Sequence, residues 1–167
     1  MKKVLTISFC LLGILFTSSV FAQATATANA SATIVTPISI SKNSDMNFGN
    51  IATDGTVGTV VLSPTGGRTI TGGVTLPAAT GTVTAASFTV NGSGSYTYAI
   101  TLPSTLTINS GTDAMIVNDF TSTPSATGTL ASGTQTITVG ATLNLVASQA
   151  EGTYTSTTPF AVTVNYN

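Results

Sequence analysis

Carboxylates are the first residues in this chain to consider for chemistry, because it has no histidine and a single cysteine. Two acids that flank a glycosidic bond can hydrolyse it, and Asp113, Asp119 and Glu151 are the candidates for such a pair. Sites of this kind usually also offer aromatic platforms to the sugar, but the chain has no tryptophan and only four tyrosines. We therefore assign a catalytic role to none of the three acids.

Other kinds of site have even less support. Asp45 and Asp54 bracket a predicted strand, but calcium takes roughly six to eight oxygen ligands, and no dense acidic loop is present. A nucleophilic serine needs a base; there is no histidine, and Lys42 is the only lysine after the first three residues. Four basic residues are too few for a nucleic-acid interface. We predict that the protein is not an enzyme and has no catalytic, cofactor-binding or metal-binding residues.

Residues 1–22 have the pattern of a secretory signal peptide. Two lysines open the chain, an apolar run extends from Val4 to Phe16, and Val20 and Ala22 occupy the small-residue positions of a cleavage site. The run is shorter than the roughly 20 apolar residues of a membrane span, and it contains the cysteine. We predict cleavage after Ala22, no stable membrane span in the mature chain, and a secreted protein of a Gram-negative bacterium, located between the periplasm and the cell surface or outside the cell.

The rest of the chain has the periodicity of strands. Threonine, which favours pleated structure, and serine make up close to a third of the chain, and short segments alternate apolar with polar residues. Turn residues separate these segments, and none has helical periodicity. The pattern predicts an all-β fold, an immunoglobulin-like or pilin-like two-sheet β-sandwich that forms a single domain over residues 37–167. The predicted strands are 25–35, 38–41, 46–51, 57–63, 68–76, 82–91, 95–102, 105–109, 114–120, 134–147 and 153–166.

Both ends of the mature chain have patterns that would suit assembly. In the N-terminal extension, residues 23–36, alanine takes every even position from 24 to 32 and polar residues take the odd ones. This extension either adds as a strand to a neighbouring subunit or is the domain's own first strand; alanine buries little area, which weakens the first alternative. The strand predicted over 153–166 either pairs with a partner or closes the sandwich. The assembly residues under this hypothesis are Ile34, Val35, Ile38, Phe160, Val162, Val164 and Tyr166.

Several segments, in one order along the mature chain, together resemble a known family. They are Thr36–Ile40, Met46–Ile51, Val60–Gly66, Ala85–Val90, Ile100–Pro103, Val139–Leu143 and Gly152–Tyr154. The set is similar to a family of secreted bacterial domains of unknown function that are often labelled fimbrial major subunits of the Mat/Ecp type. The C-terminal residues are also similar to spore-coat-U-type pilins of archaic chaperone–usher systems, which often carry a disulfide that this chain lacks. The resemblance implies a surface or fimbrial function and supplies no catalytic residues.

Two functions remain open. The first is a non-enzymatic structural protein of the cell surface, a fimbrial or pilus-like subunit assembled by strand addition, whose partners are copies of itself or a periplasmic chaperone. The second is a stand-alone secreted β-sandwich that binds a surface polysaccharide or matrix. The sparse charge and the alternating extension favour the first function. The missing disulfide and the weak apolar face of the extension favour the second.

Overall fold

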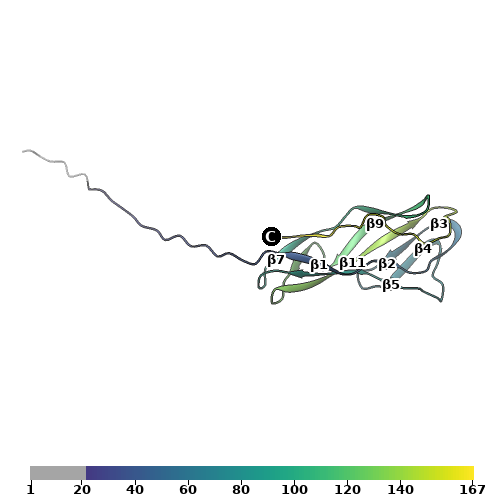
Figure 1. Ribbon diagram of the computed structural model, residues 1–167, viewed down its shortest axis with the longest axis horizontal. Helices are drawn as coiled ribbons and strands as arrows, with labels where there is room; N and C mark the ends of the chain where they lie inside the picture. Colours follow the sequence, from purple (N-terminus) through teal and green to yellow (C-terminus); the bar gives the residue numbers. More distant parts are fainter. Residues whose placement is uncertain (1–21) are drawn as a thin grey trace, which may run out of the picture. The chain divides into compact units, whose positions relative to one another are not determined.

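The computed structural model describes residues 22–167, and this part of the chain is all-β with antiparallel pairing and no helix. Ile34–Asn167 form one compact unit. Its twelve strands (Figure 1) are β1 (Ser39–Ser44), β2 (Asn47–Phe48), β3 (Ala52–Leu62), β4 (Arg68–Thr75), β5 (Val83–Thr84), β6 (Ala86–Asn91), β7 (Thr97–Thr101), β8 (Thr105–Ser110), β9 (Asp113–Thr123), β10 (Thr127–Thr129), β11 (Thr134–Leu145) and β12 (Thr163–Tyr166).

β11 is the central strand of a seven-stranded sheet. Along one edge it pairs with β9, and along the other it pairs first with β6 and then, past Gly140, with β3. β1, β4 and β8 flank β6, β3 and β9 respectively. Gly140 is suited to this exchange of partners because a Cβ atom there would collide with the backbone of Leu62 and Ser63. A second sheet has the order β10-β7-β12, and β2 pairs with β5 alone.

The core divides into two clusters that differ in how they are covered. The first lies between the large sheet and the second sheet, because β6 and β11 supply Phe88 and Ile137 while β7 and β12 supply Tyr98 and Val164. The second cluster comes from the large sheet only. It consists of Val60, Val74, Met115, Val117, Ala141, Leu143 and Leu145, from β3, β4, β9 and β11. Half of the sandwich therefore has two strand layers, whereas over the other half the second layer is incomplete.

The all-β prediction is confirmed, but several predicted strands differ in extent. The strand predicted over 46–51 is reduced to β2, β3 begins at Ala52 rather than at residue 57, and three further segments differ more. Residues 22–38 contain no strand, although one was predicted over 25–35. The strand predicted over 153–166 is reduced to β12, with one isolated bridge at Thr155. β10 was not predicted. The first two segments alternate well in sequence, but a strand also needs a neighbour to pair with, and here each lacks one over most of its length.

The signal peptide predicted over residues 1–22 lies, apart from Ala22, outside the described residues. Within residues 22–167, the structure has no helix long and apolar enough to cross a membrane.

Tyr98 in the first cluster makes stability depend on pH. Its ring is buried, its hydroxyl donates a 2.7 Å hydrogen bond to Oε1 of Gln135, and burial raises its pKa above 10.0. The unfolded chain therefore releases this proton at a lower pH than the folded chain does. The stabilising contribution is complete below pH 10.0 and is lost as the pH rises through the pKa of the folded state.

We expect Tyr98→Phe to lower the free energy of unfolding by about 1 kcal/mol at neutral pH, because the hydrogen bond to Gln135 is missing. Above pH 10 its stability should fall less steeply than that of the native chain. Urea unfolding at pH 8 and pH 11 measures both effects. If the two proteins lose the same stability between pH 8 and pH 11, the titration of another group causes the loss.

Candidate functional site

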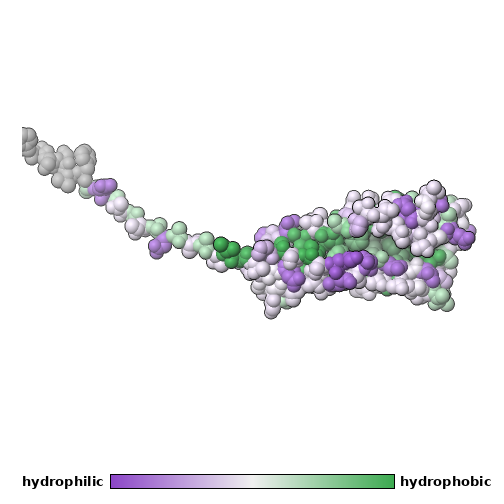
Figure 2. Space-filling model, viewed as in Figure 1, coloured by the Kyte–Doolittle hydropathy of each residue, from purple (hydrophilic) through white to green (hydrophobic). Residues whose placement is uncertain are grey.

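An open groove with an apolar floor and largely polar rims lies over the half of the sandwich where the second layer is incomplete. It has a volume of about 940 Å³ and runs between two irregular rims, residues 44–53 and residues 149–160. In Figure 2 hydrophobic residues gather in a hollow along the body, bordered by hydrophilic residues. The groove is the principal concave feature of the described residues, and we treat it as the candidate site.

The floor of the groove is the inner face of β8, β9 and β11. Because side chains alternate along a strand, every second residue of each strand points to this face. The floor residues are Leu106, Ile108, Met115, Val117, Leu143 and Leu145. The β9 and β11 side chains are buried, but Leu106 and Ile108 are only half-buried. The floor is therefore wholly apolar and incompletely covered.

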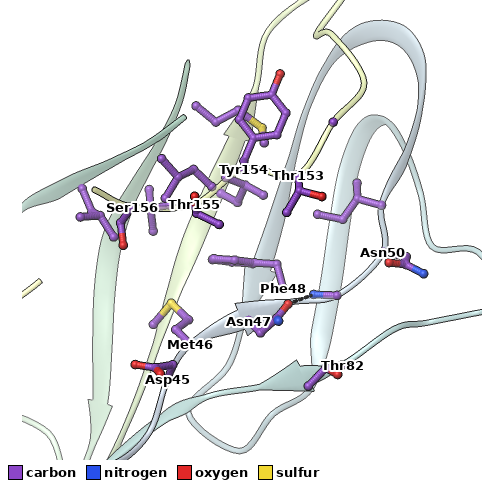
Figure 3. A pocket seen from close by; sticks show the side chains of 18 of the residues that line it. Asp45, Met46, Asn47, Phe48, Asn50, Thr82, Thr153, Tyr154, Thr155 and Ser156 are labelled. Atoms are coloured by element: carbon purple, nitrogen blue, oxygen red, sulfur yellow. Dashed lines mark hydrogen bonds between the residues drawn. The ribbon is translucent and has the colours of Figure 1, made fainter. Parts of the chain in front are cut away.

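The first rim is held in place by short-range contacts and by one arginine. β2 pairs only with β5, and the side-chain oxygen of Asn47 accepts a 2.8 Å hydrogen bond from the Gly49 amide. Gly49 has a φ of 71°, a backbone conformation that glycine adopts without strain. From this rim Met46 and Phe48 project toward the groove (Figure 3) and remain half-buried.

Arg68 fixes the backbone of the first rim from the adjacent strand β4. Its Nη1 atom donates hydrogen bonds to the carbonyl oxygens of Phe48, at 2.6 Å, and Asn50, at 3.0 Å. Hydrogen bonds from charged donors stabilise by about 1.5–3 kcal/mol. Arg68 therefore holds Phe48 at the edge of the groove.

We expect Arg68→Met to lower the free energy of unfolding by about 2 kcal/mol, because two backbone carbonyls lose a charged donor. Lys42→Met is the matched control. Lys42 makes an exposed ion pair with Asp45 at 2.7 Å, and such pairs contribute less than about 1 kcal/mol. Chemical denaturation of both variants tests the expectation, and equal losses would contradict it.

The second rim has an almost unpaired backbone. Between residues 149 and 162, only Thr155 exchanges backbone hydrogen bonds, with Asn109 of β8 at 2.9 and 3.0 Å. Tyr154 is half-buried; its hydroxyl donates to the Ala150 carbonyl oxygen and accepts from Nε2 of Gln149, both at 2.8 Å. Backbone amides and carbonyls along an unpaired edge are a template for an added strand.

Phe160 ends the groove where the two core clusters meet. Its ring packs against Phe88, with centroids 6.3 Å apart, and against Phe120, at 5.2 Å. Phe160 also packs against the first cluster, and Phe120 packs against both clusters. The second rim is therefore anchored at Phe160 and at the Thr155 bridge.

The charged groups of the site lie on its rims. Asp45 lies on the first rim and forms an ion pair with Lys42 of β1, and Glu151 belongs to the second rim. Asp54 lies outside the lining; hydrogen bonds from the Thr56 hydroxyl and amide lower its pKa. Within residues 22–167 no three acidic, histidine or cysteine side chains gather as a metal site would require. An apolar floor with unpaired backbone at its edge is suited to an extended peptide rather than to a charged ligand.

The acids considered for catalysis lie on different elements. Asp113 begins β9, Asp119 lies at the bulge of β9 with a φ of 49°, and Glu151 belongs to the second rim. The calcium candidates are likewise engaged in local contacts, Asp45 with Lys42 and Asp54 with Thr56.

The structure separates the predicted assembly residues into two groups. Val164 is buried in the first core cluster, and Ile38, Phe160, Val162 and Tyr166 pack against that cluster. These five stabilise the domain to which they belong, and of them only Phe160 lines the groove. In the second group, Ile34 is 97% exposed and Val35 is half-buried.

The groove residues themselves were missed by the sequence analysis. The alternation of β8, β9 and β11 identifies Leu106, Met115 and Leu143 as residues of a buried face. It does not show that only rim residues such as Phe48 and Tyr154 cover them. One signal was available, because Pro159 lies within the predicted strand 153–166 and cannot donate to a strand ladder.

The comparisons with known proteins agree with the extent of the folded unit. The model of a family described as a domain of unknown function, DUF4402, matches residues 38–166. The chain belongs to the DUF4402 family. The match begins one residue before β1 and ends at the last residue of β12, so the DUF4402 domain includes the groove and both rims. No curated protein and no solved structure matches the chain.

Proposed function

We propose that this DUF4402 protein is a structural subunit of a cell-surface fibre, in which the N-terminal extension of one copy enters the groove of the next. The observation that carries the proposal is the open groove itself. It combines an apolar floor with a second rim in which only Thr155, of residues 149–162, makes hydrogen bonds to another backbone segment. An added strand would complete both the hydrogen bonding and the apolar burial.

The N-terminal extension has the properties of such a strand. Its described residues have no secondary structure, and residues 22–34 are all exposed. The even positions 24–32 are alanine, and Ile34 continues the same face. Small side chains suit insertion here, because Met46, Phe48 and Tyr154 already fill part of the groove. Backbone pairing would supply the affinity, and the alternate side chains would set the register.

The base of the extension and the groove lie toward opposite ends of β11. At the Thr134 end, the Tyr166 hydroxyl accepts a hydrogen bond from the Ser93 amide at 2.7 Å and donates to the Thr36 carbonyl oxygen at 2.8 Å. At the other end, Leu145 belongs to the groove floor. A contact between unlike ends of two copies is head-to-tail, and it produces an open filament when the rotation between successive copies does not close a ring.

Size-exclusion chromatography and negative-stain microscopy of the secreted protein, with and without residues 23–36, test the proposal. We expect the intact protein to form fibres and the truncated protein to form none. The truncated protein should bind a synthetic peptide of residues 23–36. An intact protein that stays monomeric at all concentrations, with truncation changing only its melting temperature, would overturn the proposal.

The proposal extends to the route of the protein. Export to the periplasm and then to the surface follows from the predicted signal peptide. A periplasmic chaperone that lends a strand to the same groove would keep the subunit soluble before assembly, because an exposed apolar groove and an unpaired edge invite aggregation.

The outer face of the large sheet favours a second candidate function, binding of a neutral surface polysaccharide. Uncharged hydroxyl and amide residues pair across strands on this face, as in Thr59–Thr71 and Asn118–Asn144, which hydrogen-bond at 2.7 and 2.8 Å; Val61 and Ile116 are exposed beside them. Pull-down on insoluble polysaccharides by the truncated domain, which cannot polymerise under the first proposal, tests this function separately.

A further inference from the structure

The most exposed large apolar side chains gather at the two ends of β11. At the Thr134 end, called the near end here, Ile34 is 97% exposed and Tyr96 is 48% exposed. At the Leu145 end, the far end, Val57 is 62% exposed and Val146 is 58% exposed. The other exposed large apolar residues are less exposed, the next being Ile116 at 43%.

The near-end residues are tied together by Tyr166. The ring of Tyr96 packs on that of Tyr166, with centroids 5.7 Å apart. The Tyr166 hydroxyl is bonded to the carbonyl of Thr36, two residues after Ile34. Tyr96 is thus presented beside the point from which the N-terminal extension starts.

The far-end residues are brought together by the β3–β11 ladder. Its last pair is Gly58 with Leu145, and Val57 and Val146 are the next residue on each strand. They adjoin the groove, because Leu145 lines its floor and Gln149, whose side chain bonds the Val146 amide at 3.4 Å, lines its rim. β11 has 12 residues, so at about 3.4 Å per residue the two ends are roughly 40 Å apart.

We propose that the near end of one copy packs against the far end of the next, with Tyr96 and Ile34 covering Val57 and Val146. This contact rests on the proposed function, because an extension that enters a neighbour's groove brings its own near end toward that neighbour. The partner is a second copy, since the two apolar patches lie on unlike ends of one chain and both become buried in a head-to-tail array. Two side chains on each side bury far less surface area than the roughly 1,000 Å² that a stable interface needs. The contact therefore forms only after strand insertion, and it stiffens the fibre.

Thiol cross-linking tests this contact in assembled fibres. The only cysteine, Cys10, lies in the predicted signal peptide and is absent from the predicted mature chain, so the double variant Val57→Cys/Tyr96→Cys is treated directly with a short bis-maleimide. We expect a ladder of covalent multimers on a denaturing gel. The matched control is Val61→Cys/Tyr96→Cys. Val61 is also exposed, but it lies near the C-terminal end of β3, away from the far end of β11. A mono-maleimide confirms that each thiol reacts.

A second pair of variants measures the effect on the fibre. Val57→Thr/Val146→Thr should give shorter and more flexible fibres than Val61→Thr/Ile70→Thr, while binding of the 23–36 peptide to the truncated domain stays unchanged. Fibres with no ladder above the control, or with equal length in both variants, would overturn the end-to-end contact and leave strand insertion standing. Absence of both fibres and peptide binding would instead overturn the proposed function, and this contact with it.

Discussion

A carboxylate on the apolar face of the N-terminal extension should abolish polymers, whereas the same charge one residue along should be tolerated. Ala28 lies at the centre of the alanine face, and Asn29 belongs to the opposite, polar face. In an inserted strand Ala28 would point at the groove floor and Asn29 would point to solvent. Burial of an unpaired charge is strongly unfavourable, so Ala28→Asp should weaken binding by roughly a hundredfold or more.

Peptides of residues 23–36 that carry either change, titrated against the truncated domain, measure this difference directly. Microscopy of full-length Ala28→Asp and Asn29→Asp proteins tests it in the fibre. The two variants have the same added charge and the same length. If both variants lose binding and fibres equally, the extension acts through its overall charge. If both retain binding and fibres equally, the extension does not enter the groove.

The sequence pattern was sufficient to predict the strands that pair with a neighbour in sequence or along their whole length. β3 and β4 form a hairpin around Pro64–Gly67, and their alternation and turn residues lie in one continuous segment, although β3 starts at Ala52, five residues before the predicted strand. β11 was predicted two residues too long, because Val146 continues the apolar pattern beyond the last paired residue. In these cases the local signal and the tertiary partner coincide.

The groove could not be predicted, because it exists where the second strand layer over the second core cluster is incomplete. The alternation in β9 requires that Met115 and Val117 face a core, and they do. Whether a second layer covers that core depends on the path of residues 146–162. Of these, 153–162 belong to a predicted strand, yet they form a strand bridge only at Thr155. The same reasoning explains the extension. Strict alternation over residues 24–33 indicates a strand, but residues 22–38 pair with no other strand in the structure; under the proposed function the partner is a neighbouring copy.

Moving the extension to the other terminus should convert the proposed fibre subunit into a stable monomer. Asn167 ends the chain beside β7, bonded to Thr97 at 3.2 Å, so a glycine–serine linker can carry residues 23–36 from there back along the second rim. A tethered strand has an effective concentration in the millimolar range. If the free peptide binds with micromolar affinity, mass action adds about 4 kcal/mol to the free energy of unfolding, which is on the order of 10 °C in melting temperature for a domain of this size.

Calorimetry and size-exclusion chromatography of this permuted protein check the result. The same protein with Ala28→Asp in the moved segment is the control, and it should melt like the truncated domain. Both the permuted protein and its control lack a free N-terminal extension, so neither should form fibres. A permuted protein that melts at the temperature of its control would mean that the moved segment does not occupy the groove. The increase in melting temperature is therefore the sharpest test that residues 23–36 are the strand missing from the incomplete layer, because it depends on the fit of this segment alone.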